Sequence, residues 1–181
     1  VANNVFLNDE AIFNDIQAYN DENHYQKPYT IKVVNGRQIA IIGQAFPYTP
    51  IANPARLVPN LTFGIREQEL QTTLDEVKDK HKPDLVVVLS HNGVDVDKKL
   101  ASRVNGIDII LGGHTHDPVP NTIEVKNNSG VTLVANSGCN GKFISCMDIK
   151  FSGKSYTYKY NLIPILSSQI SPDKDMERYI N

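Results

Sequence analysis

The chain has 181 residues, of which 40% are hydrophobic, and this length and composition suit one globular domain with an ordinary core. The formal net charge of −2 and the scattered lysines and arginines exclude a basic surface of the kind that holds nucleic acid. No apolar run approaches the roughly 20 residues needed to cross a bilayer. The chain opens on Val1 without a signal peptide, so we expect a mature or excised piece, which says little about compartment.

The first half of the chain alternates short apolar runs with polar loops. Asn35-Gly36 lies between two β-like runs, and Asn-Gly is the strongest two-residue signal for a β-hairpin. The expected elements are a strand-like stretch at 5–7, a helix at 11–19, hairpin strands at 29–34 and 37–42, and a proline-rich loop at 45–59.

The second half alternates strands and helices before turning to short strands. Leu70, Leu74 and Val77 form one apolar stripe at helical spacing. Leu85–Leu89 is a continuous β-branched run, typical of a strand buried on both faces. The β-α-β-α-β order predicts an α/β fold with a parallel sheet covered by helices. The expected helices are 65–80, 97–104 and 173–180, and the expected strands are 85–89, 107–111, 122–126, 131–135, 143–151 and 156–163.

The two cysteines, Cys139 and Cys146, are expected to be small, partly buried thiols. No Cys-x-x-Cys pair occurs, so a cysteine zinc site is not expected. A disulfide between the two is the alternative, but their spacing, with Cys146 in a predicted strand, suits a short closed loop poorly.

Three histidines follow two predicted parallel strands. His91 comes just after the strand 85–89, and His114 and His116 come after Gly112-Gly113 at the end of the strand 107–111. Ligands of open α/β sheets bind at the carboxyl ends of the strands, and strands joined by one helix usually lie near each other. We therefore expect the three imidazoles to meet in one crevice.

Three neutral imidazoles together favour a divalent metal ion such as Zn, Fe, Mn or Co. In an extended segment, His114 and His116 would lie on the same side and would hold either one ion or two adjacent ions. A His-x-His pair alone is a weak signal, but the double glycine and the second strand-end histidine strengthen it. His24 and His81 lie in polar settings, and we expect both to be solvated.

A two-metal hydrolytic site usually needs carboxylates, one of them bridging ions about 4 Å apart. Asp97 is best explained as a helix N-cap, and Asp108 precedes its strand and so lies at the wrong end. Asp95 is expected to be solvated, while Asp117 either orients a histidine or is solvated as well. The sequence therefore offers too few carboxylates for the site it begins to build.

Two segments carry a resemblance to a known family. Ser90-His91-Asn92-Gly93 and Gly112-Gly113-His114-Thr115-His116 resemble motifs of the calcineurin-like metallophosphoesterases, in their 5'-nucleotidase branch. The segment 138–143 resembles the glycine-rich turn into the family's next strand. The resemblance implies a metallophosphoesterase-like α/β sandwich with mixed sheets and flanking helices. It also implies that His91 and His114 hold one ion and that His116 holds a second.

A narrower resemblance is to the SoxB thiosulfohydrolases of bacterial sulfur oxidation. It rests on the run Ala40–Pro54 and on the segments 90–97 and 100–117. The family's upstream motifs, which supply the bridging carboxylate and most ligands of the first ion, do not occur in this chain. The resemblance therefore implies the C-terminal half of a catalytic domain at 1–165 and the start of a linker helix at 166–181.

For a complete enzyme, this resemblance implies hydrolysis of the S-thiosulfonate on a cysteine of the carrier SoxYZ, with release of sulfate in the periplasm. The implied cofactors are two divalent ions, Mn²⁺ first and Zn²⁺ or Fe otherwise. Asn92 is a candidate hydrogen-bond donor to the substrate anion, and Arg56 is either an anion contact or simply exposed. Tyr48 lies in the loop 46–54, which either lines the entry for a carrier arm or packs as a wall.

Two other functions stay open: a 5'-nucleotidase-type phosphohydrolase, and an inert fragment that only binds metal or a partner. The isolated chain is expected to be inactive. No nucleic-acid or membrane partner is expected, whereas an exposed sheet edge would encourage dimerisation.

Overall fold

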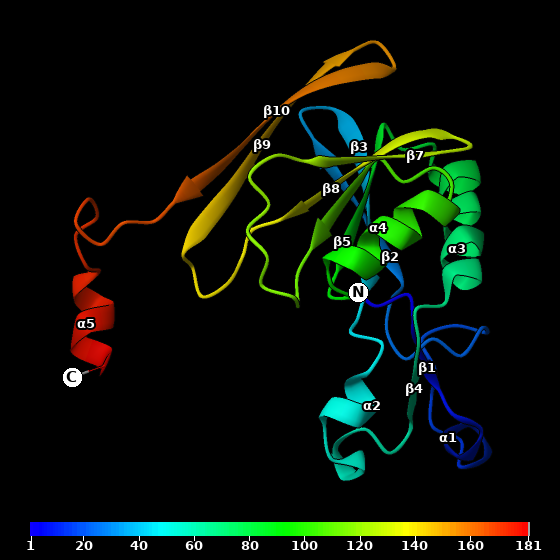
Figure 1. Ribbon diagram of the computed structural model, residues 1–181. Helices are drawn as coiled ribbons and strands as arrows, with labels where there is room; N and C mark the ends of the chain where they lie inside the picture. Colours follow the sequence, from blue (N-terminus) through cyan, green and yellow to red (C-terminus); the bar gives the residue numbers. More distant parts are fainter. Residues whose placement is uncertain (181) are drawn as a thin grey trace.

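A computed structural model describes residues 1–180 and shows a six-stranded mixed sheet flanked on both faces (Figure 1). The strands lie in the order β2-β3-β5-β6-β8-β7, and the inner four run parallel while both edge strands are antiparallel. The predicted α/β class is confirmed. The bounds are β2 Tyr29–Val34, β3 Arg37–Gln44, β5 Leu85–Ser90, β6 Ile109–Gly112, β7 Ile123–Asn127 and β8 Gly130–Asn136.

The hairpin between β2 and β3 forms as its turn residues predict. Asn35 and Gly36 have φ angles of 51° and 76°, and Val34 is paired with Arg37 across the two-residue turn. A positive φ at both central residues is the geometry of a type I′ turn, whose twist matches that of the strands. The hairpin places the end of β3 next to the end of β5, at the sheet edge described below.

Two helices cover one face of the sheet, α3 (Glu67–His81) and α4 (Val94–Arg103). The predicted stripe of Leu70, Leu74 and Val77 is fully buried, in one cluster with strand residues that include Val88 and Ile110. Each such side chain contributes about 1.5–3 kcal/mol when it is fully buried. This cluster is the larger part of the core.

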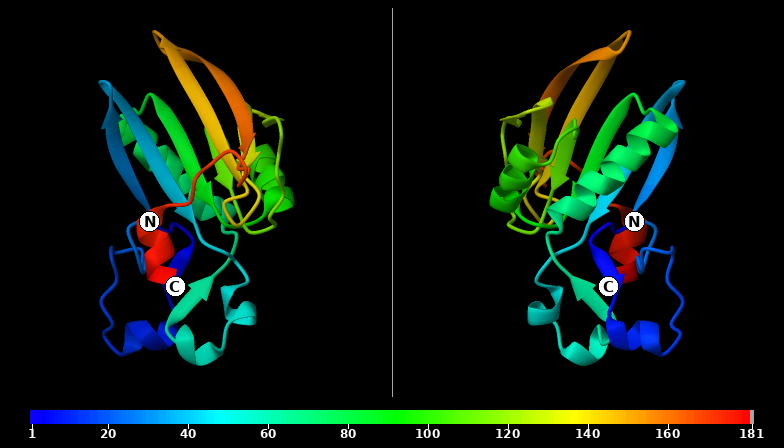
Figure 2. Two further views of the ribbon diagram at one scale, coloured as in Figure 1. Left: turned by 90° about the vertical axis from the view of Figure 1, so that its left-hand side faces the viewer. Right: turned by 90° about the vertical axis from the view of Figure 1, so that its right-hand side faces the viewer.

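A two-stranded hairpin covers the opposite face and consists of β9 (Phe143–Ser152) and β10 (Ser155–Pro164) (Figure 2). Met147, Ile149 and Phe151 alternate along β9 and pack on a second cluster of buried strand residues. That cluster consists of Leu85, Val87, Ile109 and Leu133. Both cysteines are free thiols of intermediate burial, as expected.

A smaller lobe lies below the sheet in Figure 1. It contains the strand pair β1–β4, two short helices and a 3₁₀ turn, with bounds β1 Val5–Leu7, α1 Asp9–Phe13, α2 Thr49–Ala52, η1 Ala55–Leu57 and β4 Leu61–Phe63. Helix α1 is shorter than the predicted 11–19. The Asn8 side chain caps its start, and Asp15, with a φ of 56°, turns the chain out of the helix soon after its end.

The expectation that His24 is solvated is wrong. Its side chain is 2% exposed, its Nε2 lies 3.0 Å from the carbonyl oxygen of Asn3, and its ring packs on Phe6. Burial lowers the pKa of His24 below 6.5, although the nearby Glu22 carboxylate opposes that shift. His24 therefore closes the core of the smaller lobe as a neutral imidazole.

The last helix, α5 (Lys174–Ile180), stands apart from the sheet at the end of an extended segment (Figure 1). Met176, Tyr179 and Ile180 are exposed on it. The predicted linker region 166–181 includes Asn181, which lies outside the described residues. Among residues 1–180, no helix is long and apolar enough to cross a membrane.

Candidate metal centre

The carboxyl ends of the parallel strands form one polar edge. Gln44 of β3 is paired in register with Ser90 of β5, and Gly112 of β6 with Asn136 of β8. The backbone N–H of His91 donates to the carbonyl of Gln44 at 2.9 Å, which ties the loop after β5 to the end of β3. Leu89 of β5 is paired with Leu111 of β6, so the expected convergence of the two strand ends is confirmed.

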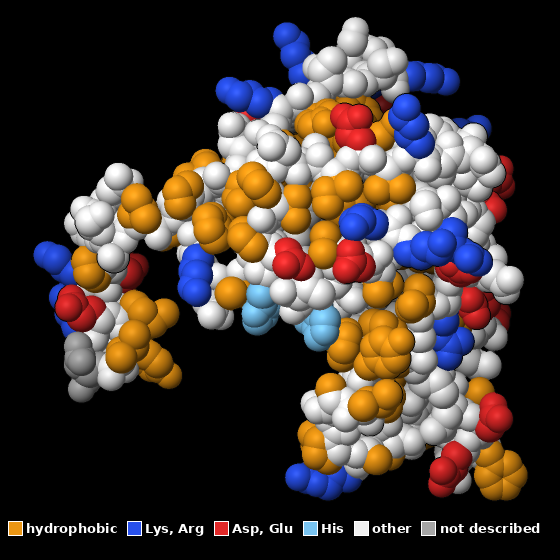
Figure 3. Space-filling view, viewed as in Figure 1, with side chains coloured by type: hydrophobic (Ala, Val, Ile, Leu, Met, Phe, Trp, Pro, Cys, Tyr) orange, Lys and Arg blue, Asp and Glu red, His pale blue; other side chains and the backbone are white. Residues whose placement is uncertain are grey.

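Two of the three histidines lie side by side at this edge. The ring centroids of His91 and His114 are 5.2 Å apart, with the rings close to edge-on at 66°. His116 is near enough for its charge to affect the titration of His91. All three side chains are exposed, and histidines face the surface along the lower margin of the sheet in Figure 3.

The backbone around His114 and His116 is not extended, so the premise that placed both on one side of a strand is wrong. Their φ angles are 81° and 61°, in the left-handed region that residues other than glycine rarely adopt. Strand β6 ends at Gly112, and the chain turns into a return loop there. Backbone strain of this kind is concentrated at functional sites.

The protonation state of His91 suits a metal ligand. Partial burial lowers the pKa of His91, and the charges of His114 and His116 lower it further. A neutral imidazole keeps the lone pair that a divalent cation needs. Within residues 1–180, however, no three His, Cys, Asp or Glu side chains converge closely enough to enclose an ion. The donors present fit a metal in kind but form an incomplete set.

Polar groups without partners lie buried at the same strand ends. Among the described residues, no hydrogen bond reaches either amide atom of Gln44, Oδ1 of Asn92, Oδ2 of Asp97 or Nδ2 of Asn136. Buried polar atoms are nearly always satisfied by protein, water or an ion. This edge therefore holds polar atoms that call for bound water or a ligand, in agreement with a site there.

The expectation that Asp97 is a helix N-cap is wrong. Gly93 occupies that position, and Asp97 lies within α4 with its side chain fully buried. Its Oδ1 accepts a hydrogen bond from Ser90 Oγ at 2.5 Å and a longer one from Asn92 Nδ2 at 3.4 Å. Burial raises the pKa of Asp97 to about 6, against these two hydrogen bonds.

The other carboxylates lie as follows. Asp95 is exposed and pairs with Lys98, as expected for a solvated group. Asp108 accepts from the backbone N–H of Val86, at the opposite end of the strands. Asp117 is exposed, and its backbone carbonyl accepts from the N–H of Gly138 at 3.1 Å. Among residues 1–180, none of them completes a group of three side chains that could enclose an ion.

The two histidine loops interlock through Thr115, which the sequence analysis did not single out. The backbone N–H of Val94 donates to Thr115 Oγ1 at 3.2 Å. Gly93 has a φ of 96°, and a β-carbon there would lie 2.7 Å from Thr115 Cγ2. A β-carbon at Gly113 would lie 3.3 Å from His91 Nδ1. The glycines therefore allow the close approach that brings His91 to His114.

The aromatic-proline loop reaches the histidines through Phe46. Its ring stacks on His114 with centroids 3.9 Å apart and lies edge-on to His91 at 6.3 Å. Tyr48 is exposed and contacts Phe46 at 5.9 Å. Phe46 therefore forms a wall of the site, and Tyr48 packs against Phe46.

Asn92 and Arg56 are the remaining candidates for substrate binding. Asn92 is buried with its amide nitrogen directed at Asp97, so it supports the loop after β5. Arg56 is exposed on the turn Ala55–Leu57 in the smaller lobe. A substrate contact by Asn92, Tyr48 or Arg56 stays a prediction.

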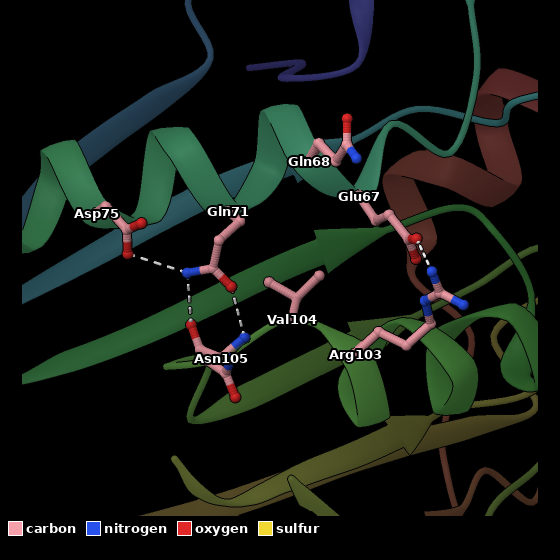
Figure 4. A pocket seen from close by; sticks show the side chains of 7 residues that line it. All are labelled: Glu67, Gln68, Gln71, Asp75, Arg103, Val104 and Asn105. Atoms are coloured by element: carbon pink, nitrogen blue, oxygen red, sulfur yellow. Dashed lines mark hydrogen bonds and ion pairs between the residues drawn. The ribbon is translucent and has the colours of Figure 1, made fainter. Parts of the chain in front are cut away.

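A cavity of about 620 Å³ lies between α3 and the end of α4 remote from Gly93 (Figure 4). Gln71 Nε2 donates to Asp75 Oδ1 and to the carbonyl of Asn105, and Arg103 pairs with Glu67. Most of the polar side chains that line this cavity therefore bond to one another.

Known proteins share this fold and part of this sequence. No family model matches the chain. The trifunctional nucleotide phosphoesterase YfkN of Bacillus subtilis is 33% identical over 138 residues, which cover 75% of this chain and 9% of that protein. The sulfate thiohydrolase SoxB of Thermus thermophilus has a TM-score of 0.82 and 28% identity, covering 99% of this chain and 30% of that one. A 5'-nucleotidase precursor, also from Thermus thermophilus, has a TM-score of 0.71 and 27% identity, covering 99% and 36%.

The mixed α/β sheet, with the histidine loops at its carboxyl edge, has the fold of a calcineurin-like phosphoesterase, YfkN of Bacillus subtilis, with a TM-score of 0.70 and 17% identity. Within that class, the chain belongs to the 5'-nucleotidase branch, which includes the SoxB-like proteins. It spans about a tenth of the length of the first of these three relatives and about a third of the length of the other two.

Proposed function

We propose that this chain supplies part of the metal site of a metal-dependent hydrolase. The observation that carries the proposal is the pair His91 and His114, whose ring centroids lie 5.2 Å apart at the carboxyl edge of a parallel sheet. His91 and His114 would hold one divalent ion, and His116 would contribute to a second. Further ligands, including a carboxylate, would come from outside residues 1–180.

When bound, divalent ions at such a site lower the pKa of a bound water and offset the charge that develops on the substrate oxygens. The residues of this chain have three tasks. His91 presents a neutral imidazole beside the ring of His114, Phe46 holds the ring of His114 in place, and Thr115 holds the two loops together. The metal is proposed to be Mn²⁺, with Zn²⁺ or Fe as alternatives.

For the substrate, we propose the S-thiosulfonate on a cysteine of the periplasmic carrier SoxYZ. Water would add to the terminal sulfonate sulfur and the bond from that sulfur to the sulfane sulfur would break. Sulfate would leave, and the sulfane sulfur would keep the electron pair, take up a proton and stay on the carrier cysteine. Support comes from the higher TM-score with SoxB than with the 5'-nucleotidase and from the SoxB-like run Ala40–Pro54. The nucleotide phosphohydrolase is the second candidate, since the YfkN match has the higher sequence identity.

We expect the full-length protein that contains this chain to release sulfate from thiosulfonate-loaded SoxYZ and no phosphate from AMP. The measurement is ion chromatography of both products with Mn²⁺ present. His91→Ala should abolish release and His81→Ala should not, because His81 lies on α3 and bonds to Tyr29. Phosphate release alone would replace the thiosulfonate proposal with the nucleotidase one.

We expect the isolated chain to be inactive and to bind Mn²⁺ weakly. In calorimetric titrations, His91→Ala and His114→Ala should each lower the affinity by about tenfold or more, since an imidazole ligand and its support are typically worth that much. The control is again His81→Ala. If all three variants bound Mn²⁺ like the unmodified chain, the ion would lie elsewhere. That result would favour an inert fragment.

A further inference from the structure

The outer edge of β2 offers unused backbone hydrogen-bonding groups. Val34 is paired with Arg37 at the turn, and the carbonyl of Pro28 accepts from Gly43 at 3.3 Å, so alternate residues of β2 bond to β3. The alternation of an antiparallel pair then directs the N–H and C=O groups of Tyr29, Ile31 and Val33 outward. In the described part of the chain, β2 is the last strand on this side of the sheet, as Figure 2 shows.

A cavity of about 510 Å³ lies beside this edge, between β2 and α3. The Tyr29 ring is fixed in its wall, because its hydroxyl donates to Glu76 at 3.3 Å and lies 3.2 Å from His81 Nε2. The remaining lining residues include Tyr19, Lys27, Pro28, Ile31 and Lys80. The edge is therefore accompanied by a hollow that can receive a side chain.

The side chains of β2 leave this edge poorly protected. Val33 and Val34 are 69% and 50% exposed, and Lys32 is the only charged residue of the strand. Most proteins protect an edge strand with several charges, a proline, a bulge or a covering element. An exposed valine next to unpaired backbone groups indicates a surface that another strand covers.

We propose that β2 pairs antiparallel with β2 of a second copy of this chain, about a two-fold axis at Ile31. In this register Tyr29 faces Val33 of the second copy, and Ile31 faces its own equivalent. The three facing pairs would exchange about six backbone hydrogen bonds. Lys32 would face a threonine, Thr30 of the second copy, so no like charges face each other.

The sequence of β2 is self-complementary, which favours a second copy over an unrelated peptide. A two-fold interface needs each residue to suit its counterpart in the reversed strand. Aromatic and β-branched residues directly opposite each other form favourable cross-strand pairs, and Tyr29 with Val33 is such a pair. Val33 of the second copy would cover the Tyr29 side of the cavity. The proposal does not depend on the hydrolase function.

Sedimentation of the whole chain from about 1 µM to about 300 µM tests the association. We expect the mass to rise from 20.2 kDa to twice that value. Val33→Lys should weaken the dimer at least tenfold, because it places a charge against Tyr29. Val34→Lys is the matched control, since its side chain points to the opposite face, and it should change the constant less than threefold. Circular dichroism should show both variants folded.

Cross-linking tests the register. Facing bonded residues have Cα atoms about 5.5 Å apart, within the range of a disulfide. Ile31→Cys, with Cys139 and Cys146 replaced by serine, should therefore form a covalent dimer on mild oxidation. Lys32→Cys should not, because that pair lies diagonally at about 7–8 Å. A chain that stays monomeric overturns the proposal. A dimer that tolerates Val33→Lys and does not cross-link at position 31 overturns it as well.

Discussion

Alanine in place of Gly93 is expected to destabilise the chain by about 2–5 kcal/mol and to abolish Mn²⁺ binding. Gly93 has φ 96° and ψ 153°, a conformation that is essentially confined to glycine. A β-carbon would also lie 2.7 Å from Thr115 Cγ2, so the two histidine loops would have to separate. Thermal unfolding without metal measures the first effect, and calorimetric titration with Mn²⁺ measures the second.

Two further variants separate the effect of the positive φ at Gly93 from the effect of the clash with Thr115. Gly153 also has a positive φ, of 61°, but nothing lies within 4 Å of the β-carbon that alanine would add. Gly153→Ala should therefore lower the free energy of unfolding by only about 1 kcal/mol. Adding Thr115→Ser to Gly93→Ala removes the methyl group that clashes and should recover part of the lost stability. Equal losses for Gly93→Ala and Gly153→Ala would show that the loops do not interlock as described.

Replacing Asp97 with asparagine is expected to raise stability relative to the unmodified chain as the pH rises. The pKa of Asp97 is about 6 in the folded chain and 3.8 ordinarily, so the folded state binds the proton more tightly. The contribution of Asp97 to stability is therefore complete below pH 3.8 and is lost as the pH rises to about 6. Across this pH window, the free energy of unfolding of Asp97→Asn should therefore rise by about 3 kcal/mol relative to that of the unmodified chain.

The measurement is chemical denaturation of both proteins in metal-free buffer at several pH values from about 4 to about 7, across the window set by the two pKa values. Asp95→Asn is the matched control, because Asp95 is exposed on the same helix. That variant should track the unmodified chain at every pH. A constant difference between Asp97→Asn and the unmodified chain would mean that Asp97 titrates normally.

Local patterns predicted the frame of the molecule well. The apolar stripe of α3 and the Asn-Gly turn each depend on residues close together in sequence, and both formed as predicted. The run Leu85–Leu89 became a central strand, although Leu89 at its end is 44% exposed. The meeting of the strand ends also followed, because it depends on topology rather than on any one contact.

The errors share a cause, which is that partners from distant elements decide a polar residue's surroundings. Asp97 fits an N-cap by local sequence, but Ser90 on β5 draws it into the interior. His24 lies in a polar stretch, yet Phe6 and Asn3 bury it. The hydrogen bond between Thr115 and the backbone of Val94 was missed because Val94, at the start of α4, lies far from Thr115 in sequence. The only sign of this bond in the sequence was that Thr115, between His114 and His116, has a polar side chain.

The burial of His24 has a consequence for the response of the whole chain to acid. Its pKa lies below 6.5, so its contribution to stability is present above pH 6.5 and is lost as the pH falls. Asp97 acts in the opposite sense in the region between pH 3.8 and about 6. Where the two titrations overlap, the two contributions to stability change in opposite directions as the pH falls, so one partly compensates for the other. The two groups lie in separate parts of the molecule, so this compensation needs no contact between them.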